Sequence, residues 1–424
     1  MSTQIRDAGT GATWGVSMAG HAASRVVTVG LWAVTVVVGA YLSYERFMDA
    51  VNSDMGTDLR VFTGAAALLR EGASIYGEQA YVYSPLISWL LLPFPSFEAA
   101  AVPWTVLSLA ACWIAVAAVV ATLWTTLRAW QRPIVAGVGL VTILWNYALV
   151  LHLWLGQTDT LVLALLALGV LLGSRGHAAA SGIAVGLTGI IKTWPVGFLL
   201  WFARRGAARR WVSLGAAAAC WAAVLLLTLA FMGPRTFADW IARTLELSEQ
   251  RLVAYSALGL GRHLFTENDI MDALVVFPIL GTVVGLVLAA GVAVLAFVTL
   301  RHPGSDSFSM WNLAGAIILL LPVSHIDYRL LMLPLLWVWL AHALSERSRS
   351  AWAMTAVMLV FWWVTFRIQP VDSVDARGSS GHYLAVMAIA FAALACSVLV
   401  AARRDRAMRK IATAEPAQTA AGPA

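Results

Sequence analysis

The chain is poor in charged residues and in cysteine. Asp, Glu, Lys and Arg make up 12% of its 424 residues, about half the share that is usual in soluble domains. The three cysteines lie inside apolar runs and form no CxxC pair, which gives no basis for a redox motif or a thiolate metal site. A glycine-rich nucleotide motif, a Ser-His-Asp signature, and HExxH or EF-hand spacing are also missing. We therefore expect neither a cofactor nor a dedicated metal site.

Long apolar runs dominate what is present. Hydrophobic residues make up 60% of the chain, and the mean hydropathy is +0.79. Runs of about 20 apolar residues with few internal charges are typical of membrane-spanning helices. The formal charge of +6 could suggest a nucleic-acid partner, but the charges are sorted along the chain in the way that membrane topology requires. The sequence predicts an all-α integral membrane protein that binds no nucleic acid.

Three regions follow from the distribution of apolar residues. Residues 1–25 form a polar N-terminal tail, residues 26–402 a polytopic membrane domain, and residues 403–424 a basic tail that we expect to be disordered. The segment 178–203 is interrupted by Lys192 and is expected to form two short helices. With these counted separately, the sequence predicts about twelve crossings. The predicted spans are 26–44, 99–127, 133–151, 159–173, 178–203, 212–232, 273–300, 310–322, 328–345, 351–368 and 382–402.

The basic residues predict the orientation. The side that would hold both termini carries most of the 28 Lys and Arg residues but few of the 22 Asp and Glu residues. Short cytoplasmic segments of membrane proteins are enriched in Lys and Arg. We therefore expect both termini in the cytoplasm and the loops 45–83 and 233–272 on the outer face of the plasma membrane.

Asp58 is the first candidate for chemistry. It lies in the first turn of a predicted amphipathic surface helix that Thr57 caps and Gly72 ends. The free N–H groups and the dipole of a helix start favour an ionised carboxylate. Such a carboxylate at an outer membrane rim can accept a proton from an attacking hydroxyl, so Asp58 is a candidate general base. The alternative is an ordinary first-turn acid on a solvated loop.

Lys192 is the second candidate, because apolar sequence surrounds it on both sides. A lysine at membrane depth is unfavourable unless it is paired or hydrated, so it marks a functional site by default. The expected partner is an anion such as a substrate phosphate. The alternative is a side chain that snorkels toward the outer headgroups.

Two polar clusters interrupt the apolar spans on the predicted outer side. The loop 152–159 contains Gln157 and Asp159 and suits the wall of a polar cavity, or a turn in which Thr158 or Asp159 caps the next helix. The segment Ser324–Arg329 is the densest polar stretch in the apolar part. A histidine there could bind a phosphate or a sugar, or its last residue could form a structural salt bridge with Asp327. Weaker candidates in the loop 233–272, where a solvated loop is the alternative, are Arg251 and His263.

Several of these stretches together resemble glycosyltransferase family 87. They are the outer aspartate Asp58, Tyr83-Ser84-Pro85-Leu86, Gly156-Gln157-Thr158-Asp159, Lys192-Thr193-Trp194-Pro195 and Ser324-His325. The resemblance extends over residues 26 to 402. Related sequences often have proline and asparagine where this chain has Ser84 and Asp159.

The resemblance implies a GT-C glycosyltransferase fold and the activity of actinobacterial polyprenol-phosphate-mannose-dependent mannosyltransferases. Asp58 would deprotonate the 2-hydroxyl of a mannose on a phosphatidylinositol mannoside, expected to be the tetramannoside. That hydroxyl would attack the anomeric carbon of β-mannosyl phosphopolyprenol, with inversion to an α-(1→2) linkage. Donor phosphate contacts are then expected from Lys192, His325, Arg251 and Arg329. Acceptor or sugar contacts are expected from Gln157, Asp159, Asp327, Tyr328 and His263.

Two other functions fit the same sequence pattern. A sister transferase could use a lipid-linked pentose, or mannose, on another glycan with the same fold and base. A transporter of lipid-linked sugars would also have many spans, broken helices and a lysine at membrane depth. Against the transporter, the ionisable residues gather on one face and the chain has no evident repeated halves.

Overall fold

Every regular element of the described chain is a helix. The computed structural model describes residues 11–53, 56–77, 81–249, 255–268, 271–366 and 380–419, and it contains no strand within those ranges. The helices are α1 (Gly11–Val51), α2 (Thr57–Arg70), η1 (Ile75–Gly77), α3 (Pro85–Leu91), α4 (Phe97–Thr122), α5 (Gln131–Leu144), α6 (Tyr147–Leu155), α7 (Asp159–Ser174), α8 (Ala178–Ile191), η2 (Trp194–Ala203), α9 (Arg210–Glu249), α10 (Ala257–Phe265), α11 (Pro278–Arg301), α12 (Asp306–Leu320), η3 (Ile326–Met332), α13 (Leu333–Glu346), α14 (Arg349–Phe366) and α15 (Ser380–Thr419). The all-α prediction is confirmed.

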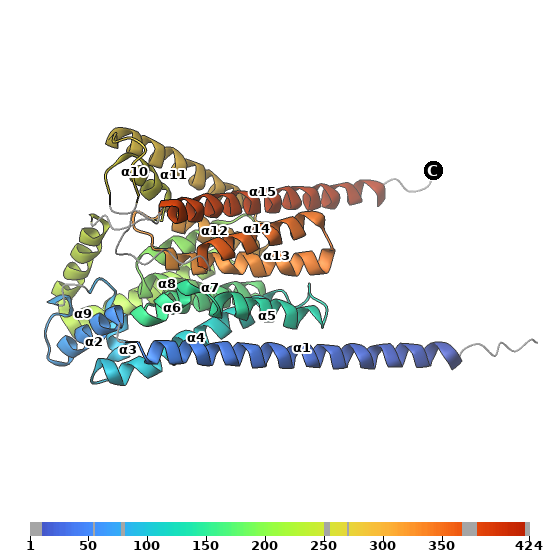
Figure 1. Cartoon of the computed structure of the whole chain (residues 1–424), viewed down its shortest axis with the longest axis horizontal. Helices are drawn as coiled ribbons and strands as arrows, with labels where there is room; N and C mark the ends of the chain where they lie inside the picture. The colour runs from blue at the N-terminus through green and yellow to red at the C-terminus, as the bar shows by residue number, and fades with distance from the viewer. Residues whose placement is uncertain are drawn as a thin grey trace, which may run out of the picture.

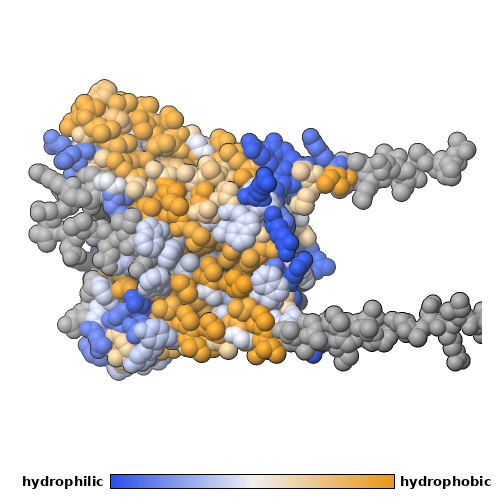
Figure 2. Space-filling view, turned by 45° about the vertical axis from the view of Figure 1, so that its right-hand side comes forward, coloured by the Kyte–Doolittle hydropathy of each residue, from blue (hydrophilic) through white to orange (hydrophobic). Residues whose placement is uncertain are grey.

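The molecule is a membrane protein. Within the described ranges, 6 helices are long and apolar enough to cross a bilayer, and up to 7 spans result if α5 and α6, bent by 59°, count as one. Apolar surface covers the middle of the molecule, with hydrophilic side chains gathered toward its ends (Figure 2). Other apolar helices, such as α7, α8 and α12, are shorter. The count of about twelve crossings stays a prediction.

The chain termini and several short helices lie at opposite ends of the bundle. The start of α1 and the end of α15 lie at the same end, and α2, α3 and α10 lie at the opposite end (Figure 1). This arrangement fits a topology with both termini on one side of the membrane. Which side is cytoplasmic stays a prediction.

Buried tryptophans anchor the interior of the bundle. Trp201, Trp337 and Trp339 are at most 1% exposed. An indole N–H is costly to bury unless it is hydrogen-bonded. Each of the three donates at 2.9 Å to a hydroxyl on another helix, and the acceptors are Ser309, Thr142 and Ser397 respectively. These bonds tie η2 to α12, α13 to α5, and α13 to α15.

Most predicted helices are present, but four details differ. The segment 133–151 is two helices, because Asn146 leaves the helical conformation and caps α6 by accepting from the N–H of Leu149 at 2.7 Å. Gly56, not Thr57, is the N-cap of α2. The helix α15 extends past Ala402 to Thr419, and the disorder expected of this tail stays a prediction. Finally, α10 has no counterpart among the predicted helices. The predicted break within 178–203 is confirmed.

Candidate active site

Asp58 lies at the start of α2, where this helix packs against the end of α6. Gly56 has φ 60°, and a Cβ there would lie 2.3 Å from the ring of Phe97. Gly156 ends α6 with φ 76°, and a Cβ there would lie 2.5 Å from the Cβ of Leu59. Glycine is the residue that tolerates both the positive φ and the close approach. These two glycines therefore bring Asp58 to the turn between α6 and α7.

Gln157 connects Asp58 to Lys192. Its Nε2 donates to Asp58 Oδ2. Its Oε1 accepts from Lys192 Nζ at 2.9 Å and from the hydroxyl of Tyr83 at 3.1 Å. Because two donors converge on the amide oxygen, the amide NH₂ group must face Asp58. Gln157 thus holds one oxygen of the Asp58 carboxylate and leaves the other for a further partner.

The ammonium group of Lys192 is paired with Asp159. Nζ lies 2.8 Å from each carboxylate oxygen, and the two side chains are 5% and 0% exposed. Nζ also lies 4.5 Å from the ring centre of Tyr328, within the range of a cation–π interaction. The snorkelling alternative for Lys192 is therefore wrong. Its anionic partner is a carboxylate of the chain itself, and contact with a substrate phosphate stays a prediction.

The local sequence explains why this pair forms. Pro195 has no N–H to donate to the carbonyl of Ile191, so α8 ends there and Lys192 takes an extended conformation with φ −128° and ψ 136°. Asp159 is the first residue of α7, where unpaired backbone N–H groups favour a carboxylate. The capping alternative holds only for position: Thr158 is the N-cap residue of α7, but it makes no side-chain capping bond in the described structure. The Asp159 carboxylate is held by Lys192.

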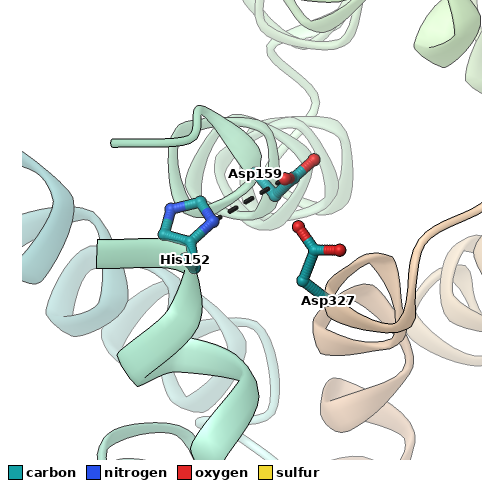
Figure 3. A group of neighbouring side chains, drawn as sticks. All are labelled: His152, Asp159 and Asp327. Carbon is teal, nitrogen blue, oxygen red and sulfur yellow. Dashed lines mark ion pairs between the residues drawn. The ribbon is translucent and has the colours of Figure 1, made fainter. Parts of the chain in front are cut away.

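A histidine and a second buried aspartate complete the cluster. His152 of α6, Asp159 of α7 and Asp327 of η3 point toward one another (Figure 3), and one ligand atom from each lies within 4.8 Å of the others. His152 Nδ1 lies 3.7 Å from Asp159 Oδ2, and its Nε2 lies 3.2 Å from the hydroxyl of Thr160. An imidazole and two carboxylates are a donor set that a divalent cation could use. Such a cation would have to share Asp159 with Lys192.

A cavity of about 260 Å³ opens beside Lys192. Tyr328 forms part of its wall and stacks on Trp194, with ring centroids 5.0 Å apart. His325 meets the same tyrosine edge to face at 5.4 Å. The lining residues are Val82, Tyr83, Lys192, Thr193, Trp194, Thr244, Leu321, Pro322, Val323, His325 and Tyr328. One side of the cavity is therefore cationic and polar, while most of the lining is aromatic or aliphatic.

Burial shifts the pKa values of Asp58 and of His325, which lines the cavity. It raises the pKa of Asp58 above its usual range, and the charge of Lys192 partly opposes this. Burial lowers the pKa of His325, and Lys192 lowers it further. His325 is therefore neutral at pH 7 and can donate one ring N–H. The start of a helix was expected to favour the ionised form of Asp58, but burial has the larger effect and raises its pKa. The ionised carboxylate is therefore a stronger base.

Other predicted site residues lie elsewhere. Arg329 donates to the backbone oxygen of Tyr255 and lies 3.6 Å from the sulfur of Met387. His263 packs against Tyr383, which in turn packs against Tyr255, so it belongs to the same second cluster. Among the described residues no ion pair joins Arg329 to Asp327, so the structural alternative, a salt bridge between these two residues, is wrong. Arg251 lies outside the described residues.

Sequence reasoning missed the roles of Tyr83 and His152. Tyr83 lies in one of the stretches that resemble family 87, and His152 lies in the polar loop 152–159, but neither was a candidate site residue. The hydroxyl of Tyr83 fixes the Gln157 amide, and His152 supports Asp159. No local sequence signal singles out Tyr83, since Pro85 restricts only the backbone of Ser84 directly before it.

Comparison with known families decides the class of protein. The profile of glycosyltransferase family 87 matches residues 81–324, more than half of the chain. The chain belongs to glycosyltransferase family 87. A search of curated proteins finds no match. Family 87 membership makes the protein a membrane glycosyltransferase and removes the transporter alternative.

The range matched to family 87 covers most of the site. It includes Tyr83, Gln157, Asp159 and Lys192, and it ends one residue before His325. Asp58 precedes the matched range, so its place in the site depends on the hydrogen bond from Gln157.

Removal of the Gln157 amide should impair the site without collapsing it. In Gln157→Leu we expect kcat to fall about 10- to 100-fold, because Asp58 is no longer held in one orientation. We also expect the acid limb of the pH–rate profile to move to higher pH, since ionised Asp58 loses a hydrogen-bond donor. Sugar transfer by the purified protein in lipid nanodiscs, measured across pH, tests both effects.

The neighbouring variant Thr158→Val is the matched control. The Thr158 hydroxyl is buried and has no hydrogen-bond partner among the described residues, so the rate and pH profile of this variant should equal those of the wild type. An unchanged acid limb in Gln157→Leu would contradict the role of Gln157 as a positioning residue.

We expect the loss of one partner of the Lys192–Asp159 pair to destabilise the protein more than replacement of both. Lys192→Met leaves a buried carboxylate unpaired, and we expect a loss of about 3–5 kcal/mol. In Lys192→Met/Asp159→Asn no unpaired charge remains, so much of the loss should be recovered. Thermal unfolding in detergent measures both variants. The exposed pair Arg243–Glu246 is the control, and Arg243→Ala should cost about 1 kcal/mol or less. Equal losses in the single and double variants would contradict this account.

Proposed function

We propose that the protein transfers mannose from polyprenyl-phosphate-mannose to a phosphatidylinositol mannoside. The expected reaction converts the tetramannoside to the pentamannoside through an α-(1→2) linkage. The proposed place is the outer face of the plasma membrane, with both termini in the cytoplasm. Family 87 membership supports sugar transfer, and the stretches shared with polyprenol-phosphate-mannose-dependent enzymes favour this donor and acceptor.

In the proposed mechanism Asp58 is the general base. The acceptor hydroxyl oxygen forms a bond to the anomeric carbon of the donor as its proton passes to Asp58. The bond from the anomeric carbon to the phosphate oxygen breaks, and the phosphate leaves with the electron pair. Attack and departure on opposite faces invert a β-linked donor to an α-linked product. The raised pKa of Asp58 makes it a better proton acceptor than an exposed aspartate.

One observation carries the proposal. Asp58 keeps one carboxylate oxygen without a hydrogen bond in the described residues, while Gln157 holds the other. The carboxylate is also close enough to Lys192 for the ammonium charge to lower its pKa. A base with a free oxygen, near a cationic cavity wall, is the arrangement that glycosyl transfer with a phosphate leaving group needs.

We assign the leaving phosphate to His325, with the charge of Lys192 behind it. Both residues line the cavity. Neutral His325 can donate a hydrogen bond, and the Lys192 charge opposes the growing negative charge on the leaving oxygens. Arg329 belongs to the second cluster and is left out of this assignment. Gln157 and Asp159, first expected to bind the acceptor, are proposed to position Asp58 and Lys192 instead.

The decisive experiment is a transfer assay in nanodiscs with labelled polyprenyl-phosphate-mannose and purified phosphatidylinositol mannosides. We expect α-(1→2)-linked product from the wild type and a loss of at least about 10³-fold in Asp58→Asn and Asp58→Ala, because no base remains. A parallel assay with a lipid-phosphate pentose donor tests the sister transferase. Retained turnover in both Asp58 variants would remove Asp58 as the base, and selective use of the pentose would overturn the mannose assignment.

We further propose that transfer needs no divalent metal, because Lys192 already supplies the fixed positive charge on Asp159. Enzyme treated with EDTA and then assayed in metal-free buffer should keep its full rate. Loss of activity that Mn²⁺ restores would instead assign a cation to the cluster of His152, Asp159 and Asp327. His152→Ala, which removes one ligand, should then raise the Mn²⁺ concentration needed for half activity.

A further inference from the structure

An apolar crevice lies beside the active-site cavity, inside a bend of α9. It has a volume of about 390 Å³. Its lining comes from the end of α8, the residue before η2 and both halves of α9. The lining residues are Ile190, Thr193, Trp221, Ala222, Val224, Leu225, Thr228, Phe237, Trp240, Ile241 and Thr244. Thr193 and Thr244 line both this crevice and the cavity beside Lys192. The two hollows are therefore adjacent and share a boundary.

Two residues of the sequence, Gly233 and Pro234, explain the bend that creates the crevice. Gly233 has φ 80° and ψ 168°, which is outside the helical region, and Pro234 follows it. Glycine accepts this backbone conformation, and proline lacks the N–H that would continue the helix. The second half of α9 consequently turns away from the first and crosses the end of the bundle (Figure 1). The crevice occupies the inner angle.

The crevice lining carries few polar groups, which are three threonine hydroxyls and the indole N–H groups of Trp221 and Trp240. The hydroxyl of Thr228 donates to the carbonyl of Val224 at 2.8 Å, and that of Thr244 donates to the carbonyl of Trp240 at 2.9 Å. Both hydroxyl protons are thus used within α9. The remaining lining is mainly aliphatic and aromatic, and the described part of the crevice has no charged side chain. Its chemistry fits a hydrocarbon chain.

We propose that this crevice binds the hydrocarbon chain of the lipid that carries the donor sugar phosphate. The inference rests on the proposed function in that the donor is a lipid phosphate. The hydrocarbon chain is bonded to the phosphate that we place beside Lys192, so the chain must extend away from that point. Thr193, the residue after Lys192, lines both the cavity and the crevice. Asp58 belongs to α2, outside the crevice lining, so the acceptor approaches from another direction. The crevice selects the donor by its chain, and the cavity selects it by its phosphate and sugar.

Photocrosslinking tests the binding directly and does not need sugar transfer. The probe is a polyprenyl phosphate with a diazirine in its chain, added to the full-length protein in nanodiscs. We expect crosslinks to map to the crevice, at positions such as Leu225 and Ile241, and to be competed by unlabelled polyprenyl phosphate. Even labelling of the whole lipid-facing surface would overturn the proposal, because it would mean that ordinary bilayer lipid fills the crevice.

A matched pair of variants tests the consequence for turnover. Ala222 lines the crevice and Ala223 does not, although both are exposed alanines on the same helix. Ala222→Trp should fill the crevice and raise KM for a long-chain donor about 10-fold or more, as expected when several methylene groups lose their burial. KM for a donor with the same headgroup and a chain of two isoprene units should be unchanged. Ala223→Trp should change neither value.

The outcomes separate this proposal from the proposed function. Equal effects of Ala222→Trp on long-chain and short-chain donors, or no effect on either, would overturn the crevice assignment while leaving transfer from lipid phosphates intact. Absence of transfer by the wild type from any lipid-phosphate sugar would overturn the proposed function. The crosslink map would still decide whether the crevice binds a polyprenyl chain, because that probe carries no sugar.

Discussion

The buried ion pair between Lys192 and Asp159 is the interaction on which the rest of the site depends. Neither charge could remain in an apolar helix bundle alone, because an unpaired buried ion costs several kcal/mol. With both present, each stabilises the other, and the ammonium group still reaches the amide oxygen of Gln157. That contact turns the amide NH₂ toward Asp58. A pair that the fold needs for stability thereby sets the orientation of the proposed base.

The site lies where the helices are interrupted. The α6–α7 turn supplies Gln157 and Asp159, the break between α8 and η2 supplies Lys192, and the segment before η3 supplies His325. Non-helical backbone at membrane depth is tolerated where it lines a cavity or is covered by protein. The bend in α9 follows the same principle, since Gly233 and Pro234 interrupt a long apolar helix beside the cavity. The other three interruptions give up regular backbone hydrogen bonds at the place where the polar groups of the site gather.

The sequence predicts which residues belong to the site better than it predicts which of them contact one another. Lys192 stood out because its surroundings are apolar, and Pro195 made the break predictable. Its partner was not predictable, because Asp159 lies 33 residues away on another helix, and hydropathy does not give the rotation of one helix about the next. The expected Asp327–Arg329 salt bridge shows the same limit. Asp327 and Arg329 are only two positions apart in the chain, which suggested a pair. The turn of η3 instead directs Asp327 toward His152 and Asp159, and Arg329 toward Tyr255.

The role of Asp58 as the base is tested most directly by an electron cryomicroscopy structure of the Asp58→Asn variant in nanodiscs with donor and acceptor lipids bound. If Asp58 is the base, the attacking acceptor hydroxyl should lie within about 3.2 Å of the position 58 side chain. The donor phosphate should then lie beside His325 and Lys192, on the opposite side of the anomeric carbon. An acceptor hydroxyl directed toward another residue, with the position 58 side chain remote from both sugars, would exclude Asp58 as the base.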